Sequence, residues 1–311
     1  MKTLKPIILV LSTGYICVYF SEHLFWARVR PDDSPANWLM LWVAYSLVAF
    51  VFLALVQYFR VRNIWALFLA GAAYGWLLEG VVVQTTYEML PLSISFTGLA
   101  WHALITIWIG WYLIQKTFIS SSVWSALRLF VLIGFLYGLW AIYWRLDPDG
   151  GVATIPEFAL FSLTTTALVI FAYGLANWSL SSPFTINRWG IGFVGFLFAP
   201  YFFFVTVPAA PSAILILPFL LLSVYLGLRW NRSSERQGSL LDTFHGQVPL
   251  WKYVSMMTLP GTGICVYALA LSLNLHWYTN WVLYIITTPL GFVVFGMSLY
   301  KLLKNRATVI P

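Results

Sequence analysis

Two ionisable residues, Glu79 and His102, lie within stretches of sequence that are otherwise apolar. Ionisable side chains at membrane depth are rare and costly, and they usually mark a functional site. A buried carboxylate and an imidazole can exchange a proton, with Glu79 as general base and His102 as its partner. The same side chains supply oxygen and nitrogen ligands for a divalent metal such as zinc.

Three further polar residues accompany this pair. Glu22 and His23 lie near the end of the first apolar run, and Glu88 follows Glu79 at the rim of the next loop. We expect a catalytic group of Glu79, His102 and Glu88, and a metal-ligand set of Glu22, His23, Glu79 and His102. The spacing matches no HExxH-type motif, so the metal set depends on residue types alone.

Four residues are candidates for contacting a substrate. Arg145 has a guanidinium suited to an anionic headgroup or a pyrophosphate. Tyr87 and Gln84 follow the deep glutamate, and Trp101 comes directly before the histidine. The alternative without a substrate is a buried glutamate–histidine hydrogen bond that fixes helix packing.

The composition requires a membrane to position these residues. The chain is 61% hydrophobic and 9% charged, whereas a soluble domain carries roughly 25% charged residues. Such a chain has too much apolar surface for a soluble fold, so lipid must be its solvent. Its net charge of +7 arises from basic residues at the ends of apolar runs, which argues against nucleic-acid binding. We expect a multi-pass protein of the cell (plasma) membrane.

Apolar runs of about 20 residues predict an all-α bundle of about ten transmembrane helices with short loops. The whole chain, residues 1–311, forms one polytopic domain in this prediction. The predicted helices lie near residues 6–25, 36–59, 64–87, 96–116, 123–144, 155–177, 189–207, 211–229, 251–273 and 279–302.

The basic residues predict the orientation of these helices. With the N-terminus in the cytoplasm, only Arg28, Arg30 and Arg145 of the 17 lysines and arginines fall outside. This bias favours an N-in, C-in topology.

Helix geometry places the candidate residues at similar depth. At 1.5 Å per residue, Glu79 and His102 lie roughly 8 and 9 Å below the outer surface. Glu22 and His23 lie about 5 Å below it. Because sequential helices joined by short loops usually pack together, the first, third and fourth helices are expected to bring these side chains close.

The third helix carries a further constraint. At about 100° per residue, Glu79 and Glu88 lie on nearly opposite faces of a continuous helix. Both can face one cavity only if the helix breaks near Thr85.

Acidic residues in the first outer loop permit another interpretation. Membrane glycosyltransferases that use lipid-linked sugars also place an acidic residue in such a loop, where this chain has Asp32 and Asp33. The segment RPDDSPANW is nevertheless typical of a helix start with Ser34 as N-cap. Thr154 and Glu157 likewise predict a capping box at a later helix start.

The leading hypothesis is an intramembrane enzyme that acts on a lipid or polyprenyl-type substrate at an outer-leaflet Glu/His site. A proton-coupled secondary transporter or lipid flippase is the first alternative, because proline and glycine interrupt the ninth and tenth helices at LPGTG and TTPLG. A non-catalytic subunit of a membrane complex is the second, since tryptophan and tyrosine are abundant. Membrane lipids, and other membrane subunits in the last case, are the expected partners.

Overall fold

The computed structural model describes residues 4–146, 152–234 and 238–307. Every regular element among these residues is a helix. Ten helical stretches are long and apolar enough to cross a membrane. The predicted multi-pass, all-α architecture is therefore confirmed.

Nine of the ten spans match the predicted runs to within a few residues, and the third ends early. The spans are Leu4–Trp26 (α1, η1 and α2), Pro35–Tyr58 (α3), Ile64–Val82 (α4 and η2), Ile94–Ser120 (η4 and α5), Val123–Arg145 (α6 and η5), Ile155–Ser179 (α7), Arg188–Ala209 (α8, η6 and α9), Ala213–Arg232 (most of α10), Leu250–Ser272 (α11 and α12) and Thr279–Lys304 (most of α13).

With all ten spans crossing the membrane, residues 4 and 304 would lie on the same side of it. Lys5 donates a 2.6 Å hydrogen bond to the hydroxyl of Ser181, in the predicted cytoplasmic loop after α7. The N-in orientation stays a prediction.

The third span ends at Val82, so the predicted helix end at residue 87 was wrong. The N–H of Val83 closes the last turn on the carbonyl of Leu78, and Gln84 then takes a left-handed conformation with φ of 76°. A non-glycine residue in this conformation cannot continue a right-handed helix. The chain therefore turns at Gln84 into a short 3₁₀ segment, η3 (Thr85–Tyr87).

Four π-helical segments interrupt the α-helical spans in the described part of the chain: η1 (Tyr19–His23), η2 (Leu78–Val82), η4 (Ile94–Ile114) and η6 (Phe202–Thr206). A π-turn pairs residues i and i+5, so it holds more residues than the 3.6 of an α-helical turn. Side chains four residues apart consequently stay aligned along η4. One such row is buried throughout: Gly98, His102, Thr106, Gly110 and Ile114.

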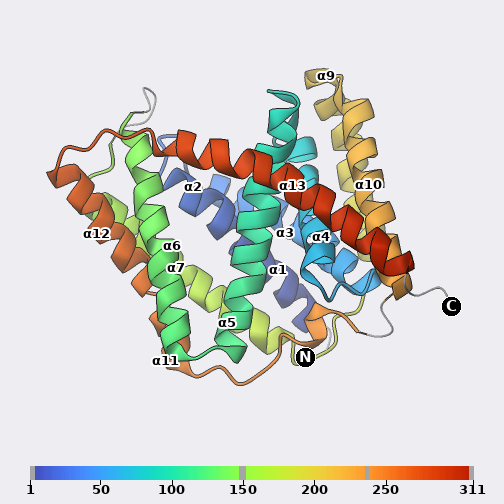
Figure 1. Ribbon diagram of the computed structural model, residues 1–311, viewed down its shortest axis with the longest axis horizontal. Coiled ribbons are helices and arrows are strands. Elements are labelled where there is room, and N and C mark those ends of the chain that lie inside the picture. The colour runs from blue at the N-terminus through green and yellow to red at the C-terminus, as the bar shows by residue number, and fades with distance from the viewer. Residues whose placement is uncertain (1–3, 147–151, 235–237, 308–311) are drawn as a thin grey trace.

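The helix packing brings these π segments together. The η1 and η2 segments both contact η4, because α1 and α4 pack beside it. Outside this centre, α6 packs on α12 and α7 on α1. In Figure 1 the long α13 (Thr279–Ala307, red) crosses obliquely, contacting η4, α4 and α10.

The helix starts agree with the capping patterns in the sequence. The Ser34 hydroxyl accepts a hydrogen bond of 3.1 Å from the N–H of Asn37 at the start of α3. Thr154 and Glu157 form the predicted reciprocal capping box at the start of α7.

The two proline-interrupted helices at the end of the chain differ from each other. The ninth span is interrupted at Met256 and Met257, just before the LPGTG segment and not within it, since α11 (Leu250–Ser255) and α12 (Thr258–Ser272) are separate helices. The tenth is continuous, because α13 runs through Pro289. The expected second broken helix is therefore absent from the described part of the chain.

Helices α6 and α12 approach closely at Gly134. A methyl group on Gly134 would lie 2.2 Å from the carbonyl oxygen of Leu259, whereas one on Gly174 of α7 would meet no atom within 4 Å. Small residues at such crossings allow close backbone approach in membranes. Gly134→Ala should therefore destabilise the protein by about 1–3 kcal/mol through overpacking.

The measurement is unfolding of the detergent-solubilised protein, followed by tryptophan fluorescence, with Gly174→Ala as the matched control. We expect the control to be at least as stable as the wild type, because alanine is the better helix former. Equal stability of the two variants would contradict this packing.

Candidate functional site

The glutamate and histidine singled out by the sequence lie in direct contact. His102 Nε2 is 2.8 Å from Glu79 Oε1, which joins η4 to η2. Both residues are buried, with 8% of Glu79 and 2% of His102 exposed. The carboxylate and the imidazole thus satisfy each other in apolar surroundings, where an unpaired partner would be costly.

The chain of hydrogen bonds continues from His102 to two hydroxyl groups. His102 Nδ1 lies 3.1 Å from Ser21 Oγ of η1, which lies 2.8 Å from Thr106 Oγ1. Because a carboxylate only accepts, Nε2 donates to Glu79 when the carboxyl is ionised, and Nδ1 then accepts from Ser21. Thr106 has one hydroxyl proton, which it can donate either to Ser21 or to the carbonyl oxygen of Trp101 at 3.1 Å; in the first case donation runs in one direction from Thr106 to Glu79.

A second hydroxyl holds the other carboxylate oxygen. Thr85 donates a short hydrogen bond to Glu79 Oε2. The left-handed turn at Gln84 directs Thr85 back toward η2, which explains why the early end of the third span matters for the site. Glu79 is therefore held on both oxygens.

The π-turn that carries Glu79 is itself anchored by side chains. Tyr87 donates a 2.7 Å hydrogen bond to the carbonyl of Gly80, and Thr206 donates one of 2.8 Å to the carbonyl of Val81. A π-turn displaces carbonyls from regular pairing, and these hydroxyls satisfy them. Tyr87, predicted to bind a substrate, thus contacts the backbone beside Glu79.

Glu22 forms a second carboxylate position beside the pair. It accepts hydrogen bonds of 2.5 Å from Tyr45 and 3.0 Å from the indole of Trp26. The Tyr45 ring lies 6.3 Å, centre to centre, from the His102 ring. Glu22 is only partly buried, so it lies between the buried pair and the surface.

His23 faces away from this group. Its ring lies 5.4 Å from the ring of Trp38 and 5.6 Å from that of Phe161. Among the described residues, no group of three His, Cys, Asp or Glu side chains could hold a metal ion. The four residues suggested as a metal set are therefore not brought together.

The remaining candidates are spread around the site. Glu88 is exposed on the loop after η3, away from the buried pair, and Gln84 is partly buried at the turn itself. Trp101 is buried, and its indole donates a 3.1 Å hydrogen bond to the carbonyl of Ser21. It therefore helps to position Ser21.

Arg145 contacts the end of another helix. Its guanidinium donates hydrogen bonds of 2.6 Å to the carbonyl of Leu275 and 3.1 Å to the side chain of Asn274, just after α12. A cation at a helix C-terminus is favourable. The headgroup contact expected for Arg145 stays a prediction.

Asp33, from the first outer loop, is engaged locally. Burial alone would raise its pKa, but hydrogen bonds from the backbone and guanidinium of Arg30 outweigh that effect and hold the pKa below its usual range. Asp33 is thus ionised and paired with Arg30 at neutral pH.

The chain matches no family model, no curated protein and no solved structure. The site is therefore interpreted from its geometry. The contribution of three residues to the site was not predicted from the sequence: Ser21, Thr85 and Thr106. The only signal for Thr106 is its position four residues after His102, and Ser21 is marked only by preceding Glu22.

The close packing of α4 on η4 depends on the absence of a side chain at Gly75. A methyl group there would lie 2.3 Å from the carbonyl oxygen of Gly98 and 2.8 Å from Cβ of His102. We expect Gly75→Ala to move His102 away from Glu79 and to change the ¹⁵N shift of its Nε2. The measurement is NMR of ¹⁵N-histidine-labelled protein, with the signal assigned through His102→Gln.

Gly296→Ala is the control, because a methyl group on Gly296 would meet no atom within 4 Å. An unchanged His102 signal in Gly75→Ala would show that the glycine does not set this contact.

Proposed function

We propose that the protein is an intramembrane enzyme that acts on a lipid or polyprenyl-type ester, with Ser21 as nucleophile, His102 as general base and Glu79 as the group that orients it. The observation that carries the proposal is the unbroken chain in which Ser21 Oγ and Glu79 Oε1 lie 3.1 and 2.8 Å from the two nitrogens of one imidazole. A nucleophile beside a base that a third group orients is the general arrangement of nucleophilic catalysis. The base is thus His102, whereas sequence analysis favoured Glu79.

The geometry supports acyl transfer in two steps. Ser21 Oγ attacks the ester carbonyl carbon and passes its proton to His102 Nδ1, while Glu79 stabilises the imidazolium through Nε2. The tetrahedral intermediate expels the alcohol, which takes the proton from Nδ1 and leaves an acyl group on Ser21. Water or a second alcohol then attacks this acyl group, giving its proton to His102, and Ser21 is regenerated with that proton.

The surroundings of Ser21 favour an apolar substrate. Ser21 is 4% exposed, and Trp101 beside it packs against Phe25 at 4.8 Å and Trp140 at 5.2 Å between ring centres. A substrate that reaches Ser21 must pass apolar and aromatic side chains, which suits a lipid that is already in the membrane. Low polarity also strengthens the interaction between Glu79 and a charged His102.

The test is covalent labelling with a long-chain alkyl fluorophosphonate, added to membranes that contain the protein. We expect phosphonylation of Ser21, located by mass spectrometry of the digested protein. His102→Gln should lower the labelling rate about 10²–10⁴-fold, because a general base contributes that much. Ser21→Ala should abolish the adduct.

Ser12 provides the matched control within the same span. It is buried like Ser21, but its hydroxyl donates to the carbonyl of Ile8 at 2.7 Å. Ser12→Ala should therefore label like the wild type. Labelling that is absent from Ser21, or that survives in His102→Gln, would overturn the acyl-transfer mechanism.

Proton-coupled transport is a second candidate, supported by the placement of Glu22. This carboxylate is partly buried and lies beside the Glu79–His102 pair, so the three groups can pass protons between the pair and the surface. The candidate predicts proton uptake by proteoliposomes that Glu22→Gln abolishes, together with an unlabelled Ser21.

A further inference from the structure

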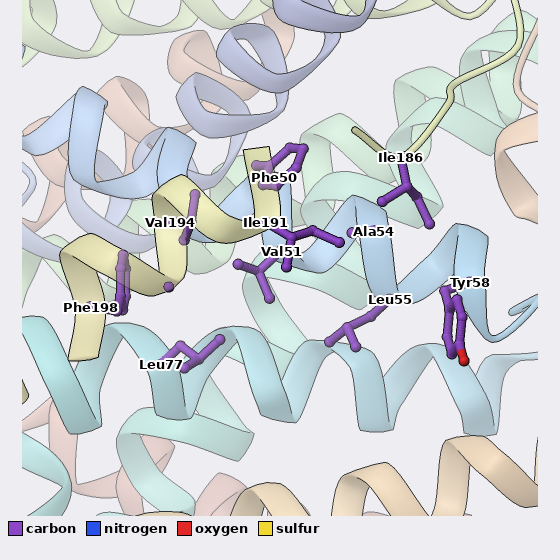
Figure 2. Close-up of a pocket in the computed structure, with 11 residues that line it drawn as sticks. Phe50, Val51, Ala54, Leu55, Tyr58, Leu77, Ile186, Ile191, Val194 and Phe198 are labelled. Carbon is purple, nitrogen blue, oxygen red and sulfur yellow. The ribbon is translucent and has the colours of Figure 1, made fainter. Parts of the chain in front are cut away.

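An apolar groove separates α8 from α3 and α4. Figure 2 shows side chains of α8 facing those of α3, with Leu77 and Phe198 toward one end and Tyr58 at the other. The groove has a volume of about 430 Å³. Apart from the hydroxyl of Tyr58, its lining side chains are hydrocarbon, among them Phe50, Leu55, Leu77, Ile191 and Phe198, and Gly195 also lines it.

The groove shares one lining residue, Tyr58, with a basic hollow. Tyr58 lines this hollow of about 500 Å³ together with Phe59, Tyr225, Arg229 and Arg232. The guanidinium of Arg232 lies 4.2 Å over the Tyr58 ring, so the residue that lines the groove also contacts a basic side chain of the hollow.

The two arginines are available to an anion. Arg229 and Arg232 are exposed, and they lie three residues apart on α10, so they occupy one face of that helix. Within residues 4–146, 152–234 and 238–307 neither forms an ion pair with a carboxylate. The predicted topology places both at the cytoplasmic surface, where anionic lipid headgroups attract basic residues.

We propose that this site binds an anionic phospholipid of the inner leaflet, with one acyl chain in the groove and the phosphate between Arg229 and Arg232. From Phe50 to Tyr58 the groove follows α3 for roughly 12 Å, so it holds a substantial length of hydrocarbon. An anionic phospholipid suits both the groove and the basic hollow. The apolar lining of the groove would not hold a free phosphate, and the two positive charges favour an anionic lipid over a zwitterionic one.

The groove also borders α8, most of whose side chains are exposed, so a lipid can enter sideways from the bilayer. The site is separate from the Ser21–His102–Glu79 chain, and it stands whether or not that chain is catalytic.

The experiment is native mass spectrometry of the full-length protein after mixing with micelles that contain equal amounts of dioleoylphosphatidylglycerol and dioleoylphosphatidylcholine. We expect one phosphatidylglycerol to be retained in preference to phosphatidylcholine. Arg229→Gln combined with Arg232→Gln should reduce that preference by about thirtyfold, since each basic residue at an anionic surface contributes about 1 kcal/mol. Lys116→Gln combined with Arg128→Gln, two exposed basic residues on α5 and α6, should leave it unchanged.

A second pair of variants tests the acyl chain alone. Gly195 lines the groove and Gly192 does not, yet a methyl group on either would meet no atom within 4 Å. Gly195→Leu should fill the groove and lower retention of both lipids at least tenfold, while Gly192→Leu on the same helix should retain them like the wild type. The proposal fails if the wild type retains the two lipids equally, if the two charge variants behave alike, or if the two glycine variants do.

Discussion

The hydrogen bond between Glu79 and His102 is the interaction on which the centre of this protein depends. Inside a membrane neither side chain has water as an alternative partner, so each must be satisfied by the protein. Removing one member of a buried pair leaves the other unsatisfied, and that loss costs more than the bond itself contributes. The surrounding structure holds His102 Nε2 and Glu79 Oε1 at a distance of 2.8 Å.

Two features of the backbone produce this separation. Glycines at positions 75 and 98 allow α4 and η4 to approach so closely that a methyl group on Gly75 would collide with the backbone of Gly98, and one on Gly98 would collide with the ring of Trp76. The π-turns then set which side chains face the contact, since Ser21, Glu79 and His102 each lie in a different π segment. Irregular hydrogen bonding in a transmembrane helix is tolerated where neighbouring side chains complete it, as Tyr87 and Thr206 do around η2.

The sequence predicted what depends on hydrophobicity and local capping. Long apolar runs located the ten spans, and Ser34 and Thr154 marked helix starts correctly, because both signals are local. Depth alone also placed Glu79 near His102. The rotation of each helix about its own axis could not be predicted from the sequence, because it depends on π-turns that have no evident sequence signature. Regular α-helical geometry does not predict that Ser21 faces His102, or that His23, two residues later, lies among aromatic rings.

The π-turn in the first span also has a consequence for how this chain tolerates length changes. Each π-turn contains one residue more than regular α-helical pairing needs, and one residue corresponds to about 100° of rotation. Loss of any single residue from Tyr19–His23 would convert η1 to ordinary helix while leaving the span long and apolar enough to insert. The C-terminal end of the first span would then present a different face to η4. In this protein, membrane insertion and assembly of the polar centre are therefore separable properties, and a one-residue deletion can remove the second without affecting the first.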